Sequence, residues 1–88
     1  MSELRARVER AVSEYIAGRL GALGRSGDAS ASRDLFDDGI LDSVALTGLI
    51  TAVEGATGRE IDFIDVDLDA FGTLEGLVAE LTRVLEAL

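Results

Sequence analysis

The chain has 88 residues, which corresponds to one small domain with a small core. Hydrophobic residues make up 48% of it and aromatic residues only 5%, so the core must consist mainly of Leu, Val, Ile and Ala, a composition that favours packed helices. The absence of His and Cys excludes His-dependent triads, Cys nucleophiles, disulfides and Cys/His zinc sites. We therefore expect that the chain is not an enzyme.

Acidic residues outnumber basic ones, with 17 Asp and Glu against 8 Arg and a formal net charge of −9. Residues 1–33 carry six Arg and four acids, whereas residues 34–88 carry two Arg and thirteen acids. Such a surface repels phosphate backbones and anionic lipids, so we expect no nucleic-acid and no membrane partner. It favours protein partners with basic docking faces.

The N-terminus is charged from the start and lacks the apolar stretch of a secretory signal, and no apolar run approaches membrane-spanning length. We therefore expect a cytoplasmic protein. With no Pro, no repeat and no low-complexity segment, residues 1–88 are interpreted as a single domain.

Apolar residues at helical spacing predict a first helix from about Leu4 to Leu23, with Gly21 and Gly24 as candidate ends. Its apolar face consists of Leu4, Val8, Ala11, Val12, Tyr15, Ile16, Leu20 and Leu23. About eighteen residues without clear periodicity follow, which is long for a compact bundle unless the loop has a task. We expect this loop to be anchored by Leu35, Phe36, Ile40 and Leu41.

A second helix is predicted after the start signal Asp42-Ser43, with Gly55 and Gly58 as stops. Its apolar stripe is Leu46, Leu49, Ile50 and Val53. A third helix is predicted after the N-cap Thr73 and carries Leu74, Leu77, Val78, Leu81, Leu85 and Leu88.

Between these two helices, residues 64–70 alternate like a strand but have no partner strand. They are interpreted as a loop with a short helical turn, with Phe63, Leu68 and Phe71 as core contacts. The fold class expected is all-α: a small bundle of three main helices plus a short helical turn, with a long loop between the first two.

The stretch from Asp34 to Leu46 delivers a serine to the first turn of the second helix. If Asp42 is the N-cap, the Ser43 hydroxyl is left uncommitted and exposed. The positive end of the helix would stabilise a phosphate ester there. The acidic flank of Asp37, Asp38 and Asp42 opposes an anion, which suggests that a basic partner docks at this place.

At these residues the sequence resembles the acyl and peptidyl carrier protein family. The resemblance rests on Asp42-Ser43-Val44 after the loop Leu35-Phe36-Asp37-Asp38-Gly39. It extends from the first helix to Leu85 and includes Thr57-Gly58-Arg59-Glu60-Ile61 and Phe71-Gly72-Thr73-Leu74. An acyl-carrier-protein-like fold is implied.

The resemblance implies that a phosphopantetheinyl transferase joins 4′-phosphopantetheine to Ser43, and that the thiol of this arm carries an acyl or aminoacyl group as a thioester. Adenylating or acyltransferase enzymes and synthase modules would load and use the cargo, and the free carrier would be a monomer. By resemblance, partners dock on the second helix and the loop before it. The residues expected there are Asp37, Asp38, Val44, Thr47, Thr51 and Glu54.

Residues 53–62 lack the Phe and the Pro of the usual fatty-acid carriers, and the approach from Gly39 to Ser43 looks more like that of stand-alone carriers for aminoacyl or other small polar units. We therefore expect a discrete carrier in polyketide or nonribosomal-peptide type secondary metabolism, which includes antibiotic biosynthesis.

Two alternatives compete with this hypothesis. Ser43 can be an ordinary residue at a helix start, and the chain a small acidic helical interaction module without a prosthetic group. Asp65, Asp67 and Asp69 resemble the start of an EF-hand loop, but its sixth position is Ala70 and its twelfth is Gly76. We therefore expect no specific calcium sensor and assign no metal ligands, while weak binding of a divalent ion stays open as an alternative.

Overall fold

The computed structural model describes residues 3–25 and 34–87. Its elements are α1 (Glu3–Ala22), α2 (Ser43–Thr57), the 3-10 helices η2 (Phe63–Asp65) and η3 (Leu68–Gly72), and α3 (Leu74–Glu86). No strand occurs within these ranges. The all-α class with three main helices is confirmed, and the segment before α3 forms two short helical turns where one was predicted.

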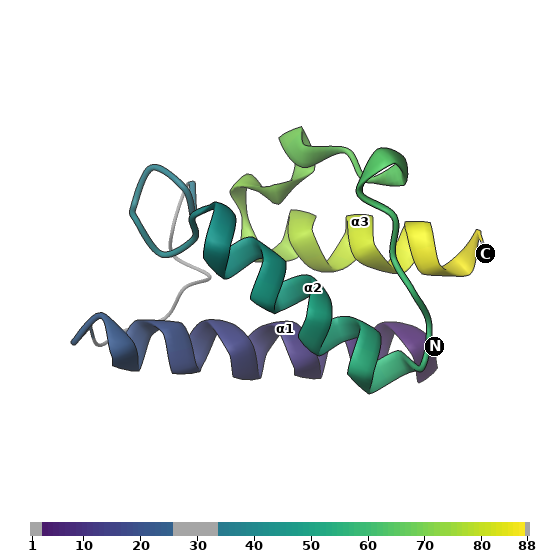
Figure 1. The fold of residues 1–88 in the computed structure, drawn as a ribbon, viewed down its shortest axis with the longest axis horizontal. Helices are drawn as coiled ribbons and strands as arrows, with labels where there is room; N and C mark the ends of the chain where they lie inside the picture. Colours follow the sequence, from purple (N-terminus) through teal and green to yellow (C-terminus); the bar gives the residue numbers. More distant parts are fainter. Residues whose placement is uncertain (1–2, 26–33, 88) are drawn as a thin grey trace.

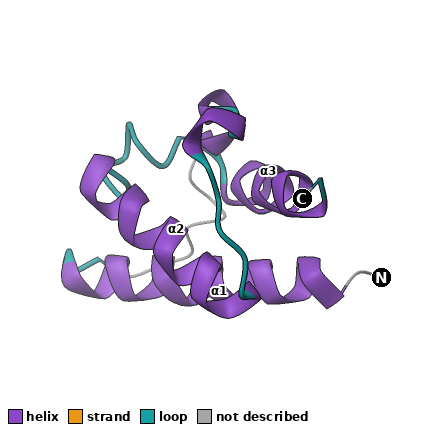
Figure 2. Ribbon diagram, turned by 45° about the vertical axis from the view of Figure 1, so that its right-hand side comes forward, coloured by secondary structure: helices purple, strands orange, loops and turns teal. Residues whose placement is uncertain are grey.

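The helix α1 is the centre of the packing. It contacts both α2, which crosses it obliquely, and α3, while η3 packs on α3 (Figure 1). The same view shows that α1 begins and α3 ends at one end of the molecule, whereas α2 begins at the other. Figure 2 shows the chain between α2 and α3 passing over the bundle, with η2 and η3 above α3. The start of α2 and the end of α3 are therefore far apart.

The ends of α1 and α2 are set by glycines with left-handed backbones. Gly24 has a φ of 68°, its N–H donates to Gly21 O and the N–H of Arg25 donates to Leu20 O, which is a Schellman motif. Gly58 ends α2 with a φ of 70° and donates its N–H to Glu54 O. Of the predicted stops, Gly21 and Gly55 therefore lie within the helices and Gly24 and Gly58 end them.

Within residues 3–25 and 34–87, twenty buried apolar residues form one core that joins all three helices to both connecting segments. Those in the connecting segments are Leu35, Ile40, Leu41, Ile61, Val66 and Phe71. The predictions for Phe36, Phe63 and Leu68 as anchors are wrong, because the turns that carry them leave runs of consecutive side chains exposed, at residues 36–39, 62–65 and 67–69. Ile61 and Val66 fill the core there instead. Leu23 is also exposed, while Leu88 lies outside the described residues.

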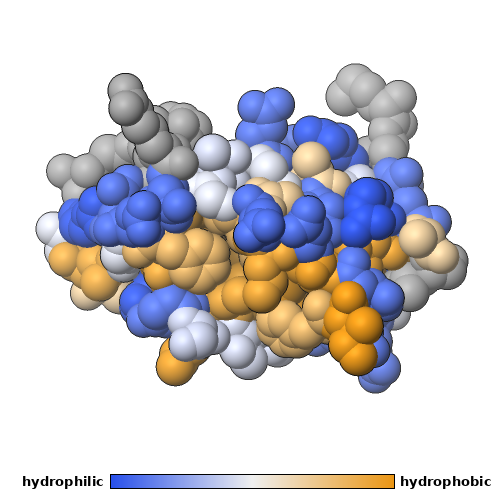
Figure 3. Space-filling model, turned by 90° about the horizontal axis from the view of Figure 1, so that it is seen from above, coloured by the Kyte–Doolittle hydropathy of each residue, from blue (hydrophilic) through white to orange (hydrophobic). Residues whose placement is uncertain are grey.

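Figure 3 looks down on the side of the molecule that carries η2 and η3. Apolar surface runs along the middle and front of this side, between hydrophilic side chains. Among the described residues, the large apolar side chains left exposed are Leu23, Phe36, Val44, Phe63, Ile64 and Leu68. Four of these six belong to the start of α2 or to the segment that carries η2 and η3.

Candidate functional site

The loop that leads into α2 is a closed turn built around Leu35. The buried Leu35 donates its N–H to Gly72 O at 2.7 Å, and its carbonyl accepts from Ile40 N and Leu41 N. Asp34 Oδ1 accepts from Phe36 N at 2.9 Å and from Asp37 N at 3.2 Å, and Gly39 has a φ of 74°. The Leu-Phe-x-x-Gly pattern thus has a physical basis: an apolar anchor, and a glycine where the backbone is left-handed.

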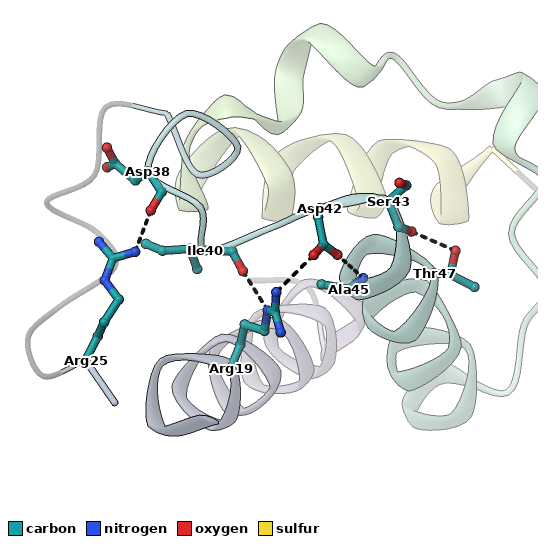
Figure 4. A network of polar contacts seen from close by, with 8 residues as sticks. All are labelled: Arg19, Arg25, Asp38, Ile40, Asp42, Ser43, Ala45 and Thr47. Atoms are coloured by element: carbon teal, nitrogen blue, oxygen red, sulfur yellow. Dashed lines mark hydrogen bonds and ion pairs between the residues drawn. The ribbon is translucent and has the colours of Figure 1, made fainter. Parts of the chain in front are cut away.

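Asp42 is the N-cap of α2, as predicted. Its Oδ1 accepts from Ala45 N at 2.7 Å, and its carbonyl accepts from Leu46 N at 2.8 Å. The other carboxylate oxygen, Oδ2, accepts from Arg19 Nη2 of α1 at 3.1 Å (Figure 4). Both oxygens of the cap are therefore committed, one to α2 and one to α1.

Ser43 is the first residue of α2 and is exposed. Its carbonyl accepts from the Thr47 hydroxyl at 3.0 Å, but its own hydroxyl makes no hydrogen bond to any residue in 3–25 or 34–87. The N–H groups of Ser43 and Val44 likewise donate to none of these residues. The head of α2 thus presents an uncommitted hydroxyl beside two unpaired backbone donors, which is a favourable setting for a phosphate ester.

Comparison with known proteins identifies the family of the chain. The family model for the phosphopantetheine attachment site matches residues 10–81, which extend from within α1 through α2 and into α3. The chain belongs to this family. No significant match was found among curated proteins or among solved structures.

Carriers of this family bear a 4′-phosphopantetheine prosthetic group and are not catalysts themselves. They interact with phosphopantetheinyl transferases and with synthase enzymes. The residues at the head of α2 fit such a group, because a phosphodiester needs an accessible hydroxyl and gains from unpaired N–H donors. Ser43 supplies the first, and the N–H groups of Ser43 and Val44 supply the second.

The other residues expected to meet partners lie in the loop before α2 and along α2 itself. Asp37, Asp38, Thr47 and Thr51 are exposed, and Val44 is 82% exposed. The hydroxyls of Thr47 and Thr51 each donate to the carbonyl four residues earlier, so they are already bonded within α2. Glu54 differs from the rest: it is half-buried, and its Oε2 accepts from Ile61 N at 2.8 Å. This carboxylate serves to hold the chain after α2.

A polar contact that the sequence analysis missed fixes the segment before α3. The buried Glu80 accepts from Asp67 N at 2.7 Å and from Arg83 Nε and Nη2 at 2.8 and 2.6 Å. Arg83 Nη2 also donates to Asp65 O at 3.1 Å. The hydrogen bonds from Arg83, helped by that from Asp67, lower the pKa of Glu80 to about 2 although burial opposes this shift. The i,i+3 spacing of Glu80 and Arg83 was the available sequence signal.

In the acidic segment between α2 and α3, two aspartate side chains cap the short helices that follow them. Asp62 Oδ1 accepts from Ile64 N and caps η2, and Asp67 Oδ1 accepts from Asp69 N and caps η3. Across residues 3–25 and 34–87, no group of three or more His, Cys, Asp or Glu side chains is arranged to hold a metal ion.

Within the same ranges, no helix combines the length and apolarity needed to cross a membrane.

Proposed function

We propose that this protein attaches 4′-phosphopantetheine to the Ser43 hydroxyl, carries an acyl or aminoacyl group as a thioester on that arm, and presents it to partner enzymes. The single observation that carries the proposal is the Ser43 hydroxyl: exposed, without a hydrogen bond to the described residues, and at the head of α2. Membership of the chain in a family of phosphopantetheine carriers supports this role for the hydroxyl.

The attachment is a transfer from coenzyme A. The Ser43 oxygen forms an ester bond to the phosphorus that bears pantetheine, and the pyrophosphate bond of coenzyme A breaks. Adenosine 3′,5′-bisphosphate leaves, and the serine proton passes to a base of the transferase. The chain itself contributes the nucleophile and its setting, and no catalytic base from the chain is needed.

The test is to incubate the protein with coenzyme A and a broad-specificity phosphopantetheinyl transferase and to record the intact mass. We expect one phosphopantetheine on the wild-type chain, none on Ser43→Ala, and one on Ser13→Ala, which removes another exposed serine. Because the chain has no Cys, a thiol titration should rise from zero to one per chain. An unmodified wild-type chain would favour the interaction module without a prosthetic group.

The cargo and pathway belong to the same proposal: a single carrier domain serving polyketide or nonribosomal-peptide type secondary metabolism in the cytoplasm, monomeric when free. The test is to offer the modified protein to adenylating enzymes with amino acids and to acyltransferases with acyl-coenzyme A donors. A hydroxylamine-sensitive mass increase identifies the cargo class. Loading only by the enzymes of fatty-acid synthesis would contradict the pathway assignment.

We also propose that partners with basic faces dock on the loop before α2 and along α2, over Asp37, Asp38, Val44, Thr47, Thr51 and Glu54. Asp37→Arg should slow association with the transferase more at low salt than at high salt, because salt screens long-range attraction. Glu86→Arg is the matched control, since it makes the same charge reversal at the far end of α3 (Figure 1). Equal slowing by both variants would mean that only net charge matters.

A further inference from the structure

One side chain of α1 holds the backbone immediately before the proposed attachment site. Arg19 donates from Nε to Ile40 O at 3.0 Å and from Nη2 to Asp42 Oδ2 at 3.1 Å. These two acceptors lie three residues and one residue before Ser43. Figure 4 shows the guanidinium of Arg19 reaching from α1 to both of them, with Ser43 directly beyond Asp42 at the start of α2.

The two contacts suit the shape of an arginine side chain. A guanidinium is planar and presents several donors in a fixed fork, so its contacts to a carbonyl and to a carboxylate set the relative position of those two groups. A lysine ammonium carries the same charge without that fixed fork. With Oδ2 of Asp42 bonded to Arg19 and Oδ1 bonded to Ala45 N, neither carboxylate oxygen is bonded to the Ser43 hydroxyl.

Arg19 also has an electrostatic effect at the same place. The side chain of Arg19 is 26% exposed and that of Asp42 is 59% exposed, so solvent screens this ion pair in part. Attachment of phosphopantetheine adds an anion next to the Asp42 carboxylate, and the guanidinium offsets that carboxylate charge. The positive charge of Arg19 on α1 therefore lies at the head of α2, where the negative charge of Asp42 would otherwise oppose the attachment of an anion.

The loop has anchors that do not depend on Arg19. The side chains of Leu35, Ile40 and Leu41 are buried, and the backbone bonds of Leu35 to Gly72, Ile40 and Leu41 close the turn. Removal of the guanidinium should therefore leave the fold intact and change the position and charge of the segment from Ile40 to Asp42.

We propose that Arg19 is a positioning residue for the modification of Ser43, acting through Asp42 and the Ile40 carbonyl. This inference rests on the proposed function of Ser43. Arg19 lies on α1, outside the loop and α2 surface to which partner contacts were assigned. Its action is on the rate of transfer within the complex and not on complex formation.

The experiment measures kcat and KM of the carrier for the phosphopantetheinyl transferase at saturating coenzyme A, below the melting temperature of every variant. Arg19→Gln should lower kcat by about tenfold while KM changes by less than about twofold, because a misplaced nucleophile slows the chemical step. Arg19→Lys should recover only part of kcat. Arg7→Gln, which removes an arginine of the exposed Arg7–Glu3 pair on the same helix, is the matched control and should match the wild type.

A double-mutant cycle tests whether Arg19 acts through the cap. Asp42→Asn keeps an oxygen for Ala45 N but loses the ion pair, so it should also lower kcat, and adding Arg19→Gln to it should cost much less than about tenfold more. The inference is overturned if kcat of the double variant falls by the product of the two single losses. It is also overturned if Arg19→Gln keeps the wild-type kcat. A loss confined to KM would overturn it too. If the wild-type chain itself takes no arm, the proposed function fails, which is a separate result.

Discussion

Replacement of glycine by alanine should have opposite effects on stability at Gly76, at the junction between η3 and α3, and at Gly55, inside α2. A Cβ added at Gly76 would lie 2.3 Å from the Ala70 carbonyl oxygen and 3.0 Å from Thr73 Oγ1, the oxygen that caps α3. A Cβ at Gly55, inside α2, would meet nothing within 4 Å. Gly76→Ala must therefore push η3 away from α3, whereas Gly55→Ala only improves the helix.

The contact geometry sets the magnitudes. Ordinary Cβ contacts begin at 3.4 Å, so the Ala70 carbonyl or the first turn of α3 must move by about 1 Å. Such overpacking costs about 1–3 kcal/mol, and Ala in place of Gly in a helix returns up to about 1 kcal/mol. We expect Gly76→Ala to destabilise the protein by about 1–2 kcal/mol and Gly55→Ala to stabilise it by up to about 1 kcal/mol.

The assay is urea unfolding followed by far-UV circular dichroism, with thermal melts of the same samples. For a domain of this size, 1 kcal/mol shifts the melting temperature by about 4–8 °C, so a difference of about 1–3 kcal/mol should separate the two melting temperatures by about 4–24 °C. Their m-values should match that of the wild type. Equal shifts of the same sign for Gly76→Ala and Gly55→Ala would refute the close approach of η3 to α3.

Three further predictions concern other contacts. Glu80→Gln should lower the free energy of unfolding above pH 4.5, and this loss should become progressively smaller as the pH falls toward 2. The reason is that the Arg83 contact lowers the folded-state pKa of Glu80 to about 2 and so stabilises only the ionised carboxylate. Urea unfolding across this pH range measures the effect. Asp42→Ala should cost about 1 kcal/mol through loss of the cap and Asp42→Asn clearly less, by the same assay. Gly48→Ala should destabilise through a Cβ placed 2.3 Å from Tyr15 Oη, and Tyr15→Phe in the same chain should relieve part of the loss in thermal melts; no relief would contradict the contact.

The ends of the helices and the head of α2 were predictable because their causes are local. Asp42 and Thr73 cap the N–H groups three residues on, and Gly24 and Gly58 supply the left-handed residue that follows a helix. These effects depend on a few consecutive residues. The free Ser43 hydroxyl has a local cause too, since the Asp42 side chain caps Ala45 N and the Ser43 side chain is not needed as the cap.

The connecting segments were harder to predict because they have no repeating pattern to show which side faces the core. Phe63 and Leu68 are as apolar as Val66, yet only Val66 is buried, because two consecutive 3-10 turns decide which side chains point inward. Phe36 likewise turns outward next to the buried Leu35. Size and hydrophobicity alone do not separate these residues.

The sequence by itself determined an acidic three-helix chain with a free serine at the start of its second helix, since periodicity, capping and motif spacing are all short-range properties. Only the tertiary structure decided which charges meet. Arg19 lies 23 residues before Asp42, and Glu80 lies 13 residues after Asp67, so neither contact exists until the helices pack. Ion pairs and hydrogen bonds act over a few ångströms, and the chain folding that brings their atoms within that range cannot be read from separation along the sequence.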